Sequence, residues 1–409
     1  MPISISSVLE VLAAHDVRPF EIDSEHVELP GIGQIEDGET VYSTSIREVF
    51  GLDGEEMAER PGIVDIDDPR LREWWGEIER IIDDQNGAIV RRVTPRLLDG
   101  RPEAPEPHCA WYCPIHFFGH GWGIYIREAC ILSHAIDIAA KVQWKSVRAP
   151  RWEIGRQLLR SAFYVFFLHE QFHHKTESLG LRLLIATGRD RYRPYKTNVY
   201  RRTFQTSDCL EESLANAESF RRLREPRYVK RVDPAIRAGL RDYLKWSIPM
   251  QPPGYAEGID YFSKAAYRDG LFNLQSQVLD GTRPPTTTAG HWSVAPNMIT
   301  ALADITDDIY VVLPRGARPI FSPTSVDPGA TVSSRALEGA LTRYYGYRLV
   351  PGGKGSHVKL AKPGAPTIII PGNRPVLSPG VVKHALEAIG GYPISKLPDF
   401  LDGRLGLQS

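Results

Sequence analysis

Residues 158–175 read LLRSAFYVFFLHEQFHHK, an apolar stretch that also carries a pair of histidines. Its apolar residues recur with a period of 3.6, which predicts a buried helix from Trp152 to His174. Within it, His169, Glu170 and His173 follow the order H-E-x-x-H. Residues four apart lie on one face of a helix, so both imidazoles can converge on a single metal ion, which we expect to be Zn²⁺.

Glu170 has a separate role in this arrangement. It lies around the helix from both histidines, so it can hydrogen-bond a water on the metal instead of binding the metal. An ordinary amphipathic helix is the alternative, but a charged glutamate and two histidines are costly on so apolar a helix unless they have partners. We therefore predict that His169 and His173 are metal ligands and that Glu170 is the catalytic base.

A catalytic zinc needs a third protein ligand, and the candidates lie in SDCLEESLANAESF, residues 207–220. Ser207 or Asp208 can cap a helix here, and that helix carries both Glu211 and Glu212. The residue types by themselves leave either glutamate open as the third ligand.

The H-E-x-x-H helix followed by E-x-x-A-N, from Glu212 to Asn216, resembles the Glu-zincin metallopeptidases and most closely the ImmA/IrrE type. The resemblance implies a mainly helical zincin-like domain in which Glu212 is the third ligand. It also implies that Asn216, one turn later, supports a ligand by a hydrogen bond. The resemblance covers two short motifs separated by a longer insert than in that family, so Glu211 remains a possible ligand.

The insert contains TGRDRYRPYKTNVYRRTF, residues 187–204, which is rich in arginine and tyrosine. One interpretation is a solvated basic loop; the other is that it borders the metal cleft and favours an acidic or phosphate-bearing substrate. In the second case Tyr192, Tyr195 or Tyr200 could donate a hydrogen bond to the oxyanion formed during hydrolysis. We take Tyr195 as the working catalytic assignment among the three.

A second group of metal-binding residue types precedes the apolar helix. It has the spacing C-x3-C-x2-H-x3-H, which is not a familiar zinc-finger spacing, and many aromatic residues lie between its members. We therefore expect these residues to pack in the core or line a cleft: His108, Cys109, Cys113, His116 and His120.

The composition is that of a globular protein, and its charge is segregated. The chain has 409 residues, 42% of them hydrophobic and 24% charged, with a formal net charge of -1. Residues 1–104 hold 10 Lys or Arg against 24 Asp or Glu, residues 105–330 hold 29 against 22, and residues 331–409 hold 10 against 4. Four cysteines are too few for a disulfide scaffold, and no signal peptide or membrane span is indicated, so we expect a cytoplasmic protein.

These patterns divide the chain into four parts. We expect an acidic N-terminal region over 1–104, the metal-binding domain over 105–313, a Pro- and Gly-rich linker over 314–332 and a C-terminal module over 333–409. Periodicity within the last part predicts helices at 334–345 and 379–389 that enclose two or three short strands, at 347–349, 357–360 and 367–370.

The C-terminal part resembles the HicA-type module, a small α/β fold like that of double-stranded-RNA-binding domains. The resemblance is carried by the Gly355-Ser356-His357 turn into a strand and by a Leu-Ser-x-Gly helix start. It implies that His357 is the catalytic residue of an mRNA-cleaving ribonuclease. An imidazole there can serve as acid or base on a ribose hydroxyl, with phosphate charge balanced by three RNA-binding lysines, Lys354, Lys359 and Lys362.

Together these features predict an α+β protein: a zinc metallopeptidase acting on a protein or peptide, with a C-terminal RNA- or partner-recognition module. The alternative is an RNA-cleaving toxin or regulator with the metal domain as sensor, held by an antitoxin or regulator protein. Growth arrest that is abolished by His357→Ala but not by Glu170→Ala would favour that alternative. A third possibility is a non-catalytic binding protein that uses the metal as a structural staple.

Overall fold

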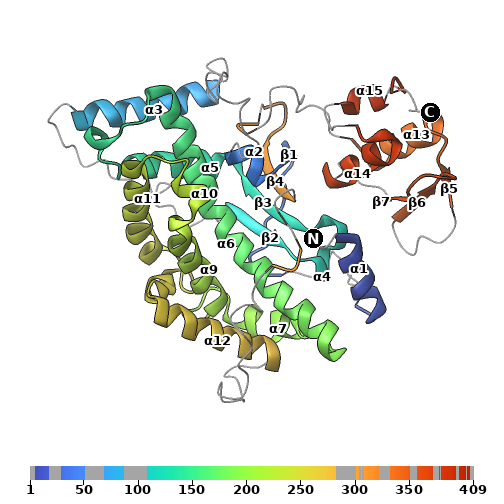
Figure 1. Cartoon of the computed structure of the whole chain (residues 1–409), viewed down its shortest axis with the longest axis horizontal. Helices are drawn as coiled ribbons and strands as arrows, with labels where there is room; N and C mark the ends of the chain where they lie inside the picture. Colours follow the sequence, from blue (N-terminus) through green and yellow to red (C-terminus); the bar gives the residue numbers. More distant parts are fainter. Residues whose placement is uncertain are drawn as a thin grey trace.

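The computed structural model describes most of the chain, including an almost complete central portion. The described residues are 5–17, 29–50, 69–86, 108–281, 301–303, 305, 308–317, 319–321, 332–350, 357–371, 377, 379–392, 396–401 and 403–405. Over these residues the protein is an α+β protein in which helices predominate (Figure 1). No helix among them is long and apolar enough to cross a lipid bilayer.

A four-stranded mixed sheet lies at the centre of the larger part of the molecule, in the order β1-β4-β3-β2. The pairing of β1 with β4 and of β2 with β3 is antiparallel, whereas β3 and β4 run parallel. The sequence IYVVLP of β4 is a short, continuously apolar run, as expected of a strand buried on both faces. The strands are β1 (Glu39–Thr44), β2 (Ala110–Cys113), β3 (Gly123–Arg127) and β4 (Ile309–Pro314).

The N-terminal region does not form a separate unit, contrary to the expected division at residue 104. Its strand β1 pairs with β4, and its helices contribute buried apolar residues to the same core as the metal-binding domain. Ile320 and Phe321, within the expected linker, are buried in that core as well. Strand pairing between distant segments is not visible in local periodicity. The helices concerned are α1 (Ile5–Ala14), α2 (Ile46–Phe50) and α3 (Pro69–Asn86).

The helix α6 (Arg151–Thr187) runs through the middle of the larger part and packs on the sheet and on the helices around it (Figure 1). It is 37 residues long, so it continues past the expected end at His174 and stops at Gly188, which has the positive φ of 69° common at helix ends. The helices around it include α5 (Glu128–Ala139), α9 (Leu210–Arg221), α10 (Pro226–Val229), α11 (Pro234–Ser247) and α12 (Lys264–Asp280).

The C-terminal part has its own core and the expected order of elements, a helix, three strands and a helix. Its strands form an antiparallel sheet in the order β5-β6-β7, and its buried apolar residues begin at Val332. The predicted boundaries differ from the observed ones by at most one residue. The elements are α13 (Ser334–Tyr344), β5 (Arg348–Leu349), β6 (His357–Ala361), β7 (Ile368–Pro371) and α14 (Pro379–Gly390), followed by α15 (Leu397–Leu401).

Candidate metal centre

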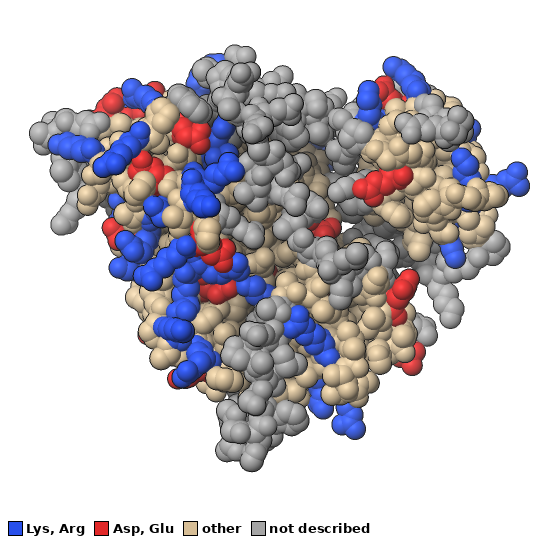
Figure 2. Space-filling view, viewed as in Figure 1, with Lys and Arg blue, Asp and Glu red and all other residues tan. Residues whose placement is uncertain are grey.

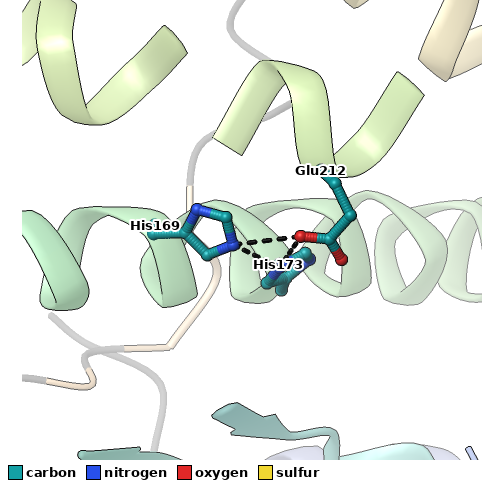
Figure 3. Close-up of side chains that lie close together, drawn as sticks. All are labelled: His169, His173 and Glu212. Carbon is teal, nitrogen blue, oxygen red and sulfur yellow. Dashed lines mark hydrogen bonds and ion pairs between the residues drawn. The ribbon is translucent and has the colours of Figure 1, made fainter. Parts of the chain in front are cut away.

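Two histidines of α6 point the same way, toward α9 (Figure 3). The Nε2 atoms of His169 and His173 lie 3.4 Å apart, because the two residues are separated by one helical turn. His173 is buried and His169 is nearly so, with side chains that are 8% and 12% exposed. The predicted convergence of the two imidazoles is confirmed.

Glu212 enters this group from α9, which packs across α6. Its Oε2 atom lies 3.0 Å from Nε2 of His169 and 3.5 Å from Nε2 of His173. Metal–ligand bonds of about 2.0–2.1 Å in a tetrahedral site require ligand atoms about 3.3–3.4 Å apart, close to these separations. The buried trio can therefore hold a metal ion.

The other ring nitrogen of each histidine is held by an oxygen from α9. Nδ1 of His169 lies 2.9 Å from Oδ1 of Asn216, and Nδ1 of His173 lies 2.9 Å from Oε1 of Glu211. Such partners fix the ring orientation and present Nε2 to a metal. Glu211 is thus placed behind His173, and Glu212 is the glutamate that faces both Nε2 atoms.

The amide of Asn216 is itself fixed by two acceptors. Its Nδ2 atom donates to Oε1 of Gln251 at 2.7 Å and to the backbone oxygen of Tyr255 at 2.9 Å. With both donors used in this way, the amide oxygen is the atom that faces His169, as the resemblance implied. The helix that carries these residues begins at Leu210 with Cys209 at its N-cap and no side-chain cap, so the expected capping by Ser207 or Asp208 is wrong.

The segment predicted as a basic loop is instead helical and supports the two glutamates. It consists of α7 (Tyr192–Tyr195), the π-helical turn η4 (Lys196–Tyr200) and α8 (Arg201–Thr203). A π-helical turn is rare and is frequently found at functional sites. Here it brings one cation and two phenol groups of the segment onto adjacent carboxylates.

Tyr195 does not have the position expected of an oxyanion donor. Its hydroxyl donates to Oε2 of Glu211 at 2.8 Å, and the same oxygen accepts from Lys196 Nζ at 3.1 Å. Tyr200 donates to Oε1 of Glu212 at 2.5 Å. Because both phenols are buried and engaged by carboxylates, the assignment of Tyr195 as a catalytic residue is corrected to a supporting role.

Neighbouring cationic side chains keep Glu211 and Glu212 ionised although both are buried. Burial by itself would raise the pKa of Glu212, but His173 and His169 more than offset it and hold this pKa well below its usual range. Burial likewise opposes ionisation of Glu211, and Lys196 and His173 lower its pKa. An anionic Glu212 is the form that binds a metal cation.

Glu170 lies on the same helix and is only 5% exposed. Burial raises its pKa, and the charges of His169 and His173 act in the opposite direction. Its carboxyl therefore differs from those of Glu211 and Glu212, whose pKa values are lowered. Neighbouring carboxyls with pKa values shifted in opposite directions are a common property of acid–base catalytic sites.

Tyr255 was not anticipated from the sequence. Its ring stacks on the imidazole of His169, with centroids 5.8 Å apart and planes inclined by 12°. Burial, the charge of Glu212 and a hydrogen bond with that carboxylate raise its pKa well above the usual value, so its hydroxyl stays protonated. Unlike Tyr195 and Tyr200 it is only half-buried. Tyr255 lies outside the helices predicted from the sequence and gives no local sequence signal.

Of the second group of cysteines and histidines, Cys113 and His116 are buried as predicted, whereas His108 is exposed and the disulfide of Cys109 was not predicted from the sequence. Cys109 forms a disulfide with Cys130, and Cys113 is a buried free thiol. His116 is fully buried, and its Nδ1 atom lies 2.6 Å from Oε1 of Glu177. His116 therefore holds the segment after β2 against α6, and the disulfide joins the residue before β2 to α5.

The C-terminal candidates are only partly described. His357 is the first residue of β6, but the position of its side chain lies outside the described part, as does Lys354 altogether. Lys359 and Lys362 are half-buried at the same end of the chain. The predicted catalytic role of His357 and the RNA contacts of the three lysines stay predictions.

Comparison of the chain with protein-family models, with curated proteins and with solved structures found no significant match. The fold and the site themselves define the kind of centre. Two histidines of α6 and Glu212 of α9 can hold a metal ion, and the buried Glu170 lies beside them.

Proposed function

We propose that the protein is a zinc-dependent peptidase. The observation that carries the proposal is the meeting of three ligand atoms, from His169, His173 and Glu212, at separations suited to a tetrahedral ion. Two imidazoles and one carboxylate are ligands that zinc accepts, and three protein ligands leave a position for substrate or water, as in catalytic sites. A zinc ion bound there would act as a Lewis acid toward a peptide carbonyl and lower the pKa of water.

The protein's own residues supply the remaining chemistry. Glu170, beside the two histidines, accepts a proton from the attacking water and returns it to the leaving amine. Tyr255 donates a hydrogen bond to the carbonyl oxygen as negative charge develops on it. Glu211 and Asn216 keep the imidazoles oriented throughout, because their contacts are to the ring nitrogens that face away from Glu212.

Metal analysis tests this proposal directly. The purified full-length chain is expected to contain about one zinc per molecule by plasma mass spectrometry and to hydrolyse an unfolded protein such as casein. His173→Ala should lose both properties, whereas His134→Gln, on α5 away from the centre, should keep both. Wild-type protein without zinc, or hydrolysis unaffected by a chelator, would contradict the proposal.

The role of Tyr255 gives a second prediction. Removing one oxyanion donor costs about 10²–10³ in kcat, so Tyr255→Phe is expected to lower kcat to that extent with KM changed less than about twofold. Zinc content should stay at the wild-type level. Tyr261→Phe, on the neighbouring segment, is the matched control and should retain wild-type kcat. Equal activity of the two variants would remove Tyr255 from the mechanism.

A second proposal concerns the C-terminal part. Its order of helix, three strands and helix supports the proposal of an RNA- or partner-recognition module resembling the HicA type. In that case Lys359 and Lys362 would contact phosphate groups, and an antitoxin or regulator protein would be a natural partner. A variant with Lys354, Lys359 and Lys362 changed to Glu tests nucleic-acid binding by this module separately from binding by the rest of the chain.

A further inference from the structure

A surface rich in lysine and arginine covers α10 and α11, away from the residues assigned to the metal centre. Residues 221–245 contain nine Lys or Arg against three Asp or Glu. Figure 2 shows cationic side chains gathered over the side of the molecule where Figure 1 places these helices. We call the following exposed residues the α11 basic face: Arg224, Lys230, Arg231, Arg241 and Lys245.

Within the described part of the chain, the cations of the α11 basic face pair with no acidic side chain. None has a carboxylate oxygen within 4.0 Å among the residues that the structure describes. The neighbouring Arg222, by contrast, pairs with both Glu218 and Glu225. Arg237, Arg241 and Lys245 follow one another at intervals of four along α11, and like charges at that spacing destabilise a helix. The repulsion between these cations destabilises the free protein, and a bound anion would relieve it.

The surface is also hollowed beside α11. A cavity of about 390 Å³ opens between this helix and residues 141–148, and its charged lining residues are Lys141, Arg148, Asp233 and Asp242. Gly239 permits the close approach of the two segments, since a Cβ there would lie 2.6 Å from the Val142 side chain. The carboxylate of Asp233 in the lining is already engaged by backbone N–H groups, including that of Arg148 at 2.9 Å.

The residue types of this surface indicate which anionic partner it fits: a membrane, an acidic protein or a phosphate-bearing molecule. The exposed large apolar residues of the described chain include none between Ile185 and Met250, so the face offers no apolar anchors for insertion into a membrane. Protein interfaces are enriched in aromatic and apolar residues, which are equally missing here. Arginines without partners suit phosphate groups, which they bind through paired N–H donors.

We propose that the α11 basic face binds the phosphate backbone of a nucleic acid. The proposal is independent of the peptidase function, because it uses no residue of the metal centre. Backbone contacts of this kind are insensitive to base sequence and strongly dependent on salt. A single-stranded RNA and a duplex DNA share this chemistry, and separate binding measurements distinguish them.

The test is a fluorescence anisotropy titration of the full chain with labelled RNA of about 20 nucleotides and duplex DNA of about 20 base pairs, from about 50 to 200 mM salt. The triple variant Arg231→Glu, Arg241→Glu, Lys245→Glu is expected to bind at least one of them about a hundredfold more weakly than wild type, with a shallower salt dependence by up to about three units in the log–log slope. The corresponding glutamine variant should show a smaller loss and guards against misfolding by charge reversal.

Two matched variants keep the assignment falsifiable. Reversal of three exposed cations elsewhere, Arg189→Glu, Arg201→Glu and Arg202→Glu, should leave affinity within about threefold of wild type. A loss confined to a variant with Lys354, Lys359 and Lys362 changed to Glu would assign binding to the C-terminal module and overturn the proposal. The proposal would also be overturned if the wild-type protein bound neither nucleic acid but bound an acidic polypeptide.

Discussion

Changing Glu170 to glutamine is expected to abolish most peptide hydrolysis, by about a thousandfold or more in kcat, while zinc remains bound. The amide has nearly the same shape as the carboxylate but cannot accept a proton from water, and general acid–base catalysis contributes about 10²–10⁴ in rate. The three ligand atoms come from other residues, so the metal content should be unchanged. The measurements are kcat on a peptide substrate and zinc per chain.

A control for this experiment is Glu79→Gln on α3, where the same chemical change is made at a partly exposed position. It should retain wild-type activity. Full hydrolysis by the Glu170→Gln protein would exclude Glu170 as the base. Loss of zinc from that protein would show that the carboxylate is needed to hold the metal, which the present assignment does not allow.

The largest expected effect on stability comes from Glu177, a buried carboxylate on α6. It accepts hydrogen bonds from the Tyr112 hydroxyl, from the backbone N–H groups of Ile115 and His116, and from the His116 ring. Glu177→Ala removes the acceptor of the two backbone N–H groups and of the His116 ring, and leaves the Tyr112 hydroxyl only His174 Nδ1, at 2.8 Å. We therefore expect the free energy of unfolding to fall by about 3–5 kcal/mol. Urea denaturation measures this value.

An exposed glutamate provides the comparison for Glu177. Glu73→Ala on α3 should change the free energy of unfolding by less than about 0.5 kcal/mol, as is usual for surface positions. A similarly small change for Glu177→Ala would mean that the bonds between α6 and the segment after β2 are not formed in solution.

The stability due to Glu177 should depend on pH with a defined sign. Burial by itself raises the pKa of this carboxyl, but its hydrogen bonds with His116 and Tyr112 outweigh burial and lower it below the ordinary value of 4.5. A lowered pKa in the folded state gives stability that is fully present above the unfolded pKa and is lost as the pH falls below it. The difference in unfolding free energy between wild type and Glu177→Ala should therefore shrink below about pH 4.5.

The local features of this protein were open to prediction because they depend on residues near one another in the chain. The four-residue separation of His169 and His173 places both on one helical face whatever the rest of the fold is. The helices and strands of the C-terminal part follow from periodicity in the same way. The position of Glu170 next to a ligand is fixed by the same helix.

Features that depend on distant segments were not predicted. The pairing of β1 with β4 joins residues 39–44 to residues 309–314, which made the acidic N-terminal region part of the main core. Tyr255 reaches His169 from a segment that gives no pattern of its own. Residues 192–203 are helical, and their tyrosines and lysine contact the two glutamates of α9, which composition alone does not reveal.

The sequence by itself determined the chemistry of the centre, since histidine and glutamate types at helical spacing specify which atoms can bind a metal. Only the tertiary structure decided between Glu211 and Glu212. Consecutive residues of a helix point about 100° apart, so the two carboxylates cannot both face the same ion. Which one does is set by the rotation of α9 against α6, a property of packing between helices: Glu212 meets both Nε2 atoms, and Glu211 meets the far side of His173.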